Sequence, residues 1–534
     1  MVGESMKQYS SVDQAFAAAL EYHQNGNLYE AQTIYHHILQ IEPTHYQSIG
    51  NLGLLSIQLD KIYQAREYLI RATTVNPDYQ EAYTNLGNLY FQQSEFELAI
   101  NAYQNAVRIS PDDEEVWANL GNAFLKEKRD KEAVKSYKKA LKLNPNRPDL
   151  YDFLGDCYYI LEQYKTAIVS YRNVLKIDKT NATCYYKLGQ AYQQIGQYRH
   201  SIDCYKRSLS LQPENAEVNC QLGTVLLLTG DYKNGWLKYE WRRKINKYKR
   251  NIVQPAWVGG DCRGKTLLVY AEQGLGDTIQ FSRFIPFLED KDCLVVFECQ
   301  PPLKPFFEEW NPFSGFVDVF STGEDLPEFD LYVPLMSLPY ILNLDMIEKI
   351  PLPLRGRPFS SVPNQKMNNR LSNENNLQVG LVWAGNPEHA RDSHRSMKFN
   401  QILDWLNTPG CDFFSLQVGV AARELYETTN LPISSSIVDL GKTFNNFFDT
   451  AKAISQLDLV ISVDTSVAHL AATMEIPTWI MLTANPDWRW LLSQTKSPWY
   501  PSVRLFRQVW GGGWDSVILK IGGEIKKLAM LKKN

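Results

Sequence analysis

Three short stretches in the second half of the chain carry residue types suited to acid–base and anion-binding chemistry. In the first, Gly274, Gly276 and Asp277 follow the apolar run 266–270. Glycines let a ligand approach the backbone closely, and free N–H groups at a helix start attract anions. A carboxylate at a helix start is either a cap or a base directed into a cleft. We take Asp277 as the candidate base.

The second stretch, residues 384–396, is rich in cationic and hydroxyl groups and lies between a predicted strand and a predicted helix. Such groups ahead of a helix N-terminus suit a diphosphate. The candidate ligand-binding residues here are Asn386, His389, Arg395 and Ser396. Gln417, at the end of the next predicted strand, is a candidate for reading a nucleobase or ribose.

The third stretch, residues 462–469, contains the end of another predicted strand at Asp464. Thr465 and Ser466 open the following predicted helix, and their N–H and hydroxyl groups can bind an anion. Each residue also has a structural interpretation, since Asp464 can cap the helix and His469 can be a core histidine. Three such stretches at three strand ends favour a shared binding site over three separate structural roles.

The elements that carry these stretches alternate between strand and helix from residue 265 to 482, which predicts parallel sheets. A polar segment rich in Pro, Asn and Ser, 352–376, separates two series of elements. We expect one lobe over 251–360 and a second over 375–534, ending in a helix. Because ligands bind at the carboxyl ends of parallel strands, two such lobes place the three stretches across one crevice.

The first half of the chain is a repeat array. A Leu-Gly pair recurs every 34 residues, with a small residue and a tyrosine in fixed phase behind it. The glycines of these pairs are Gly53, Gly87, Gly121, Gly155, Gly189 and Gly223. The pattern resembles the tetratricopeptide repeat, and about seven units fit within 12–250. We expect an all-α solenoid in which glycine allows close helix packing.

The resemblance implies a concave groove that holds a peptide or protein segment. Candidate groove residues are Asn51, Asn85 and Asn119. Their amides suit a peptide backbone, although they are equally compatible with exposed polar positions on a helix. The basic segment 239–250 is predicted to be a solvated helix end, and the short linker after it predicts that the two halves are docked.

The amino-acid composition bears on the kind of partner and on the cellular compartment of the protein. The net charge of −4 gives no support for a nucleic-acid partner. The eight cysteines contain no CxxC pair, so buried reduced thiols are expected. No secretory signal is visible, and no apolar run approaches the roughly 20 residues of a membrane span. We therefore expect a cytoplasmic protein without a transmembrane segment.

Residues 265–510 resemble glycosyltransferase family 9, the heptosyltransferase-like proteins with two Rossmann lobes (the GT-B fold). The stretch 463–470, VDTSVAHL, is similar to that family's V-D-T-G-x-x-H-L motif, with Ser466 in place of glycine. Gly276 and Asp277 match its G-D pair, which carries the base, and Arg395 falls where the family has a phosphate-binding lysine. The whole arrangement is similar to bacterial tetratricopeptide proteins that carry such a domain.

The resemblance implies an inverting transfer of a sugar from a nucleotide sugar to an acceptor recruited by the array. Asp277 would accept the acceptor's proton, and Arg395, Ser396 and the N–H groups at Thr465 and Ser466 would stabilise the diphosphate. No DxD pair ends a suitable strand, so no metal is expected, and no cofactor besides the donor substrate. Trp488 and Trp490 are predicted to pack under a terminal helix; stacking on a sugar or a base is the alternative.

Two other functions remain open on the sequence. One is a non-catalytic scaffold with a degenerate transferase-like domain. The other is a different two-lobe enzyme, such as a nucleotide-sugar epimerase, which would gain little from a peptide-binding array.

Overall fold

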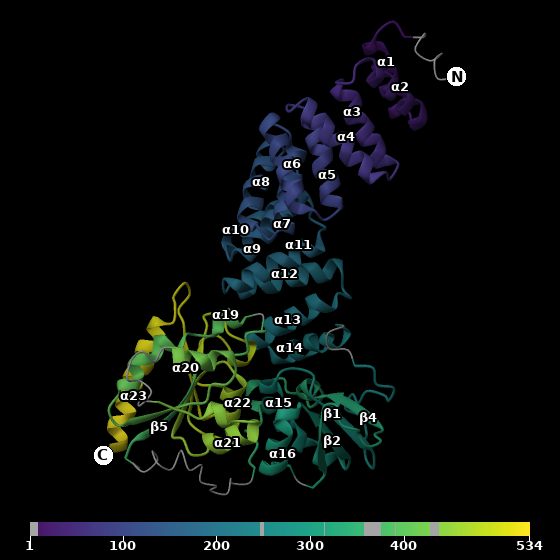
Figure 1. Ribbon diagram of the computed structural model, residues 1–534. Coiled ribbons are helices and arrows are strands. Elements are labelled where there is room, and N and C mark those ends of the chain that lie inside the picture. The colour runs from purple at the N-terminus through teal and green to yellow at the C-terminus, as the bar shows by residue number, and fades with distance from the viewer. Residues whose placement is uncertain are drawn as a thin grey trace. The chain divides into compact units, whose positions relative to one another are not determined.

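The computed structural model describes residues 9–245, 250–313, 315–356, 375–389, 391–427 and 437–533. The chain divides into two compact units, Met1–Tyr192 and Gln193–Asn534 (Figure 1). Most of the predicted interlobe linker, 352–376, lies outside the described residues.

The chain begins with fourteen α-helices that form seven consecutive pairs in the described part of the repeat region. They are α1 (Val12–Gln24), α2 (Leu28–Ile41), α3 (Tyr46–Gln58), α4 (Ile62–Val75), α5 (Gln80–Gln92), α6 (Phe96–Ile109), α7 (Glu114–Lys126), α8 (Asp130–Leu143), α9 (Pro148–Ile160), α10 (Tyr164–Ile177), α11 (Ala182–Gln194), α12 (Tyr198–Leu211), α13 (Ala216–Leu228) and α14 (Tyr232–Tyr239). The predicted all-helical array is confirmed, with α12 to α14 inside the second unit.

The recurrent glycine is explained by the recurrent tyrosine. A Cβ on Gly87 would lie 2.5 Å from the Tyr103 ring, which packs on the glycine from the second helix of the same repeat. The Tyr103 hydroxyl then donates to Asn88 Oδ1 at 2.7 Å. Where leucine replaces the tyrosine, at Leu69, the side chain packs on Gly53 in the same way. The glycine therefore makes room for the side chain that joins the two helices.

The second unit contains a four-stranded parallel sheet in the order β3-β2-β1-β4. Its strands are β1 (Thr266–Tyr270), β2 (Leu294–Cys299), β3 (Val317–Ser321) and β4 (Leu331–Pro334). Its α-helices are α15 (Leu275–Phe281), α16 (Lys304–Trp310) and α17 (Leu338–Ile341). Strand β1 is central and apolar, and its last four residues are buried.

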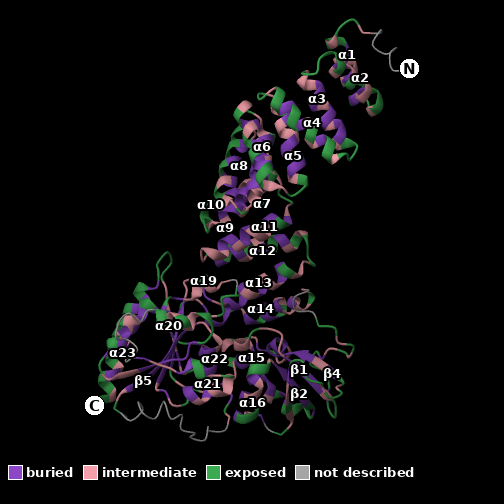
Figure 2. Cartoon of the chain, viewed as in Figure 1, coloured by how far each residue is buried: buried purple, intermediate pink, exposed green. Residues whose placement is uncertain are grey.

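A six-stranded parallel sheet follows in the order β10-β9-β8-β5-β6-β7. Its strands are β5 (Leu377–Val382), β6 (Cys411–Ser415), β7 (Ile437–Asp439), β8 (Leu459–Val463), β9 (Thr478–Leu482) and β10 (Val503–Arg507). Its α-helices are α19 (Asp392–Arg395), α20 (Glu424–Glu427), α21 (Phe447–Ile454), α22 (Ser466–Thr473) and α23 (Asp515–Lys533). Figure 2 shows that buried residues follow the strands and the facing sides of the paired helices.

Both sheets reverse their strand order at one point, between β1 and β4 and between β5 and β8. Parallel sheets with such a reversal bind ligands outside the carboxyl ends of the strands at the reversal. The segments that leave β1, β5 and β8 are the three predicted stretches. The predicted parallel sheets are confirmed. The three stretches predicted to bind a ligand follow strands at the points where the strand order reverses.

Some elements differ from the predictions. The sequence predicts a helix over 278–288; in the structure it begins earlier, at Leu275, and becomes a 3-10 helix from Ser282 to Lys291, where Pro286 lacks the N–H that an α-helix needs. The predicted helix 399–407 is also a 3-10 helix. Strand β10 was not predicted. Residues 428 and 436, at predicted element ends, lie outside the described residues.

The basic segment 239–250 was predicted to be a solvated helix end, and this prediction is wrong for one of its arginines. Arg242, in the 3-10 helix Glu240–Lys244, is fully buried. Two carboxylates explain its burial, because Arg242 pairs with Glu240 and Glu272 at 2.6 Å each. Residues 246–249 lie outside the described part. No helix in the described residues has the length and apolarity to cross a membrane.

Candidate functional site

Asp277 lies in the first turn of α15, where its carboxylate is held by two donors. Its Oδ2 accepts the Gly274 N–H at 2.9 Å, and its Oδ1 is bonded by the Arg489 guanidinium. Only 20% of its side chain is exposed. Burial raises the pKa of the Asp277 carboxyl, and the charge of Arg489 opposes the rise. Asp277 is thus both a cap of its own helix and half of a buried ion pair.

Gly276 brings the first stretch against the third. A Cβ on Gly276 would lie 2.9 Å from His469 Cδ2 and 3.5 Å from the Ser466 Cα. The start of α15, after the first sheet's β1, therefore contacts the start of α22, after the second sheet's β8; both helices lie side by side in Figure 1. Thr465 is the N-cap of α22 and accepts the Ala468 N–H at 3.4 Å.

Asp464 connects the third stretch to the second. Its backbone oxygen accepts a hydrogen bond from Arg395 Nη1 at 3.1 Å. Burial and the negative charge of Asp487 raise the pKa of the Asp464 carboxyl to about 6, although Arg395 opposes this. A carboxyl with a pKa near 6 exchanges its proton close to neutral pH. Arg395 also bonds Asp392 through Nε at 3.2 Å.

His469 is a buried neutral imidazole. Its side chain is 7% exposed, and burial together with the positive charge of Arg489 lowers its pKa to about 3. One ring nitrogen, Nδ1, lies 2.9 Å from the Tyr500 hydroxyl, and the ring stacks on Trp490 with centroids 5.1 Å apart. Its Nε2 lies 3.9 Å from Asp464 Oδ1. Because the ring is neutral, this last contact is no ion pair.

The second stretch is held largely by its own hydrogen bonds. The Ser396 hydroxyl accepts the Gly385 N–H at 2.9 Å and donates to Asp392 at 2.8 Å. Asn386 Oδ1 accepts the Glu388 N–H at 3.1 Å. His389 accepts the Arg391 N–H at 3.2 Å, and its pKa is lowered by burial and by nearby arginines. Residue 390 lies outside the described part.

Gln417 joins β5 and β6 through its side-chain amide. Its Oε1 accepts the N–H groups of Trp383 and Ala384, at 3.1 and 3.0 Å. Its Nε2 donates to the Ala384 and Val418 carbonyls. The side chain is buried. Any contact of this amide with a nucleobase or ribose would replace one of these backbone bonds.

Several residues at this site were missed by the sequence analysis, above all Arg489 and Asp487. Arg489 bonds Asp487 at 2.6 Å while it pairs with Asp277. Burial disfavours the charged form of Asp487, yet the charge of Arg489, its two hydrogen bonds to Asp487 and the charge of Arg391 together lower the Asp487 pKa. The only sequence signal was the PDWRW segment, in which an acid and a base flank a tryptophan.

The two tryptophans of that segment pack, as predicted, but not under the terminal helix α23. Trp488 lies among rings of α14 and α15, with centroids 5.3 Å from Trp236, 6.0 Å from Tyr239 and 6.1 Å from Phe281. Trp490 is fully buried against His469. The last helix of the repeat array therefore contacts the segment that carries Arg489.

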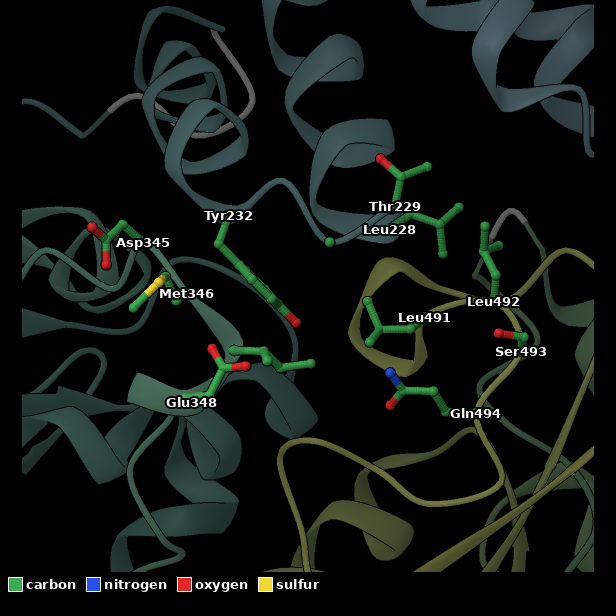
Figure 3. A pocket seen from close by; sticks show the side chains of 12 residues that line it. Leu228, Thr229, Tyr232, Asp345, Met346, Glu348, Leu491, Leu492, Ser493 and Gln494 are labelled. Carbon is green, nitrogen blue, oxygen red and sulfur yellow. The ribbon is translucent and has the colours of Figure 1, made fainter.

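A cavity of about 460 Å³ is lined in part by the residues that directly follow this segment (Figure 3). Its walls come from the turn before α14, from residues 345–348 and from residues 491–494. None of the predicted site residues lines it. Tyr232 is one of the lining residues in Figure 3, but the side chain is buried and its hydroxyl is covered by protein atoms.

The three predicted groove residues belong to the first unit and are all half-buried. Asn51 Nδ2 donates to the Gln47 carbonyl at 2.8 Å, within α3. Asn119 Nδ2 donates to Asn88 Oδ1 at 3.4 Å, which links adjacent repeats. Among the described residues, no group of three or more His, Cys, Asp or Glu side chains is arranged to hold a metal ion.

Comparison with protein families confirms the repeats. A tetratricopeptide repeat model matches residues 114–147 and 182–215, and another matches 46–79. A TPR repeat model matches residues 87–128 and 155–196. These repeats suggest that the protein takes part in protein–protein interaction.

Among curated proteins, the chain is similar to Protein FlbA of Caulobacter vibrioides, with 26% identity over 323 residues, covering 55% of this chain and 52% of the relative. The chain thus spans about half the length of the curated relative that it matches. Solved structures with similar repeats include YrrB, described as a TPR protein with an unusual peptide-binding site (17% identity, 34% of this chain and 95% of that one, TM-score 0.33). Others are MamA of Desulfovibrio magneticus (24%, 31% and 92%, 0.29) and PilF of Pseudomonas aeruginosa (21%, 39% and 94%, 0.32).

Proposed function

We propose that the second unit is a metal-independent glycosyltransferase of the GT-B type, which moves a sugar from a nucleotide-sugar donor to an acceptor. The single observation that carries the proposal is the contact between the starts of α15 and α22. At this contact Gly276, the neighbour of Asp277, lies against Ser466 and His469 of α22, and the Asp464 backbone oxygen just before α22 is bonded by Arg395. A carboxylate beside fixed anion-binding groups is what acid–base catalysis of such a transfer requires.

Asp277 is the proposed base. Burial raises the pKa of its carboxyl, and the charge of Arg489 opposes the rise; a carboxylate with a raised pKa holds an accepted proton more tightly. The acceptor hydroxyl would approach Oδ1 and displace the Arg489 contact, while the Gly274 N–H continues to orient Oδ2. Arg489, released from Asp277, would remain bonded to Asp487 as a positive group close to the reacting oxygen.

The donor diphosphate would bind at the start of α22 and along the second stretch. Arg395 supplies a guanidinium, which suits phosphate oxygens; its present acceptors are the Asp464 backbone oxygen and the Asp392 carboxylate. Thr465 and Ser466 add N–H groups at the start of α22. The repeats of the first unit would recruit the acceptor, which we propose to be a protein or peptide.

The test is donor binding and turnover on the full chain. Isothermal titration with a panel of nucleotide sugars should identify one donor, and the Asp277→Asn variant should bind it with unchanged affinity but transfer no sugar. Asp325→Asn, at an exposed position of the first-sheet region, is the matched control and should keep full turnover. Retained transfer by Asp277→Asn would refute the assignment of the base.

A non-catalytic scaffold is the alternative, and one observation favours it. Both Asp277 and Arg395 are engaged in bonds within the protein, to Arg489 and to Asp464 and Asp392. If no nucleotide sugar binds at millimolar concentration while a protein partner still associates with the repeats, the scaffold is the correct function.

A further inference from the structure

Tyr239, the last residue of α14, contacts both segments that hold the Asp277–Arg489 pair. Its hydroxyl accepts a hydrogen bond from Gln273 Nε2 at 2.8 Å. Its ring packs against Trp488, with centroids 6.0 Å apart. Tyr239 is buried, and burial raises the pKa of its hydroxyl, so the hydroxyl stays a neutral hydrogen-bonding group.

The two residues that Tyr239 contacts, Gln273 and Trp488, each directly precede a residue that is bonded to Asp277. Gln273 precedes Gly274, whose N–H orients Asp277 Oδ2 at 2.9 Å. The Gln273 backbone is also held from the other side, because its carbonyl accepts Gln300 Nε2 at 2.6 Å. Trp488 precedes Arg489, whose guanidinium lies 4.3 Å from the Trp488 ring centroid.

We infer that Tyr239 is a positioning residue for the Asp277–Arg489 pair. Through Tyr239, the last helix of the repeat array, α14, would help to hold the catalytic carboxylate in place. The statement that Tyr239 supports catalysis rests on the proposed function, whereas the contacts of Tyr239 with Gln273 and Trp488 do not depend on it. A shift of α14 would move Gln273 and Trp488 together, and with them both members of the pair.

The preceding repeat offers a matched control. Tyr205 occupies the equivalent position, 34 residues earlier, and is equally buried. Its hydroxyl bonds Gln193 at 3.1 Å, on the neighbouring helix of its own repeat. Tyr205→Phe therefore removes the same atom from the equivalent position of the preceding repeat, and the bond that it removes is to Gln193 rather than to Gln273.

Hydrogen exchange on the full-length protein tests the inference. In Tyr239→Phe, amides of residues 271–278 should exchange about fivefold faster, since the loss of one hydrogen bond frees that segment. Tyr205→Phe should leave those amides unchanged. Gln273→Met removes the other partner of the bond, and the double variant should exchange no faster than either single variant. Equal exchange in both tyrosine variants, or acceleration spread over both sheets, would overturn the inference.

Turnover separates the inference from the proposed function. If wild-type protein transfers sugar, Tyr239→Phe should lower kcat severalfold with little change in the donor KM, and an unchanged kcat would overturn the catalytic part of the inference. If wild-type protein turns over no donor while the exchange result holds, the proposed function fails and the positioning of the pair stands.

Discussion

The carboxylate of Asp277 pairs with the guanidinium of Arg489, 212 residues later in the chain. The pair joins the helix start after β1 to the segment after β9, and so connects the two sheets. Asp487 bonds the same guanidinium at 2.6 Å. Two carboxylates thus share one buried arginine, whose side chain is only 8% exposed.

Removal of Arg489 should be costly because it leaves two carboxylates without their cation. We expect Arg489→Gln to lower the free energy of unfolding by about 3 kcal/mol. The double variant Asp277→Asn/Arg489→Gln should recover part of this loss, because one buried charge has gone. Urea unfolding of the four proteins of the cycle measures the coupling energy, and a coupling near zero would contradict the ion pair.

Gly276→Ala should destabilise the contact between α15 and α22. The added Cβ would meet His469 Cδ2 at 2.9 Å, and we expect a loss of about 1–3 kcal/mol, as in other overpacked contacts. Gly260→Ala is the control, since no atom lies within 4 Å of its Cβ position. Thermal unfolding compares the two, and equal midpoints would show that the helices do not meet at Gly276.

Asp464 should make stability depend on pH in one direction. Its pKa rises from 3.8 to about 6 on folding, so between these values the folded protein holds a proton that the unfolded chain has released. This contribution is fully present below pH 3.8 and is lost as pH rises through about 6. Compared with Asp464→Asn, wild-type protein should therefore lose up to about 3 kcal/mol over this window. Unfolding free energies measured at several pH values test this, and a constant difference would contradict it.

Arg395 should determine donor affinity under the proposed function. Arg395→Gln removes the guanidinium offered to the diphosphate, and we expect binding of the donor to weaken roughly tenfold. Arg395→Lys keeps the charge and should lose less. Arg423→Gln, at an exposed arginine, controls for net charge, and an equal effect of both Gln variants on titration would remove Arg395 from the donor site.

Much of the fold could be predicted because local patterns determine it. The 34-residue period identified the repeats, and the strands that the sequence predicts over 266–270, 459–463 and 478–482 agree with β1, β8 and β9. These strands are runs of apolar residues buried on both faces, which sequence patterns reveal well. Strand β10, VRLFR, carries two arginines at the edge of its sheet, and it has no such run.

The site was only partly predictable. Strand order explains why residues after β1, β5 and β8 converge, and the sequence analysis used that rule. Arg489 follows no such rule, because it lies in a 3-10 turn after β9 whose course depends on Trp488 packing against α14. Tyr239 looked like one more repeat tyrosine, since nothing local distinguishes it from Tyr205.

The close approach at Gly276 has a consequence for how a ligand reaches Asp464. Only a hydrogen atom fits between the Gly276 backbone and His469. The two sheets are therefore in direct contact through α15 and α22 at this point. A movement that separates the two sheets would break both this contact and the Asp277–Arg489 ion pair. We therefore expect a ligand to reach Asp464 with both sheets staying in place.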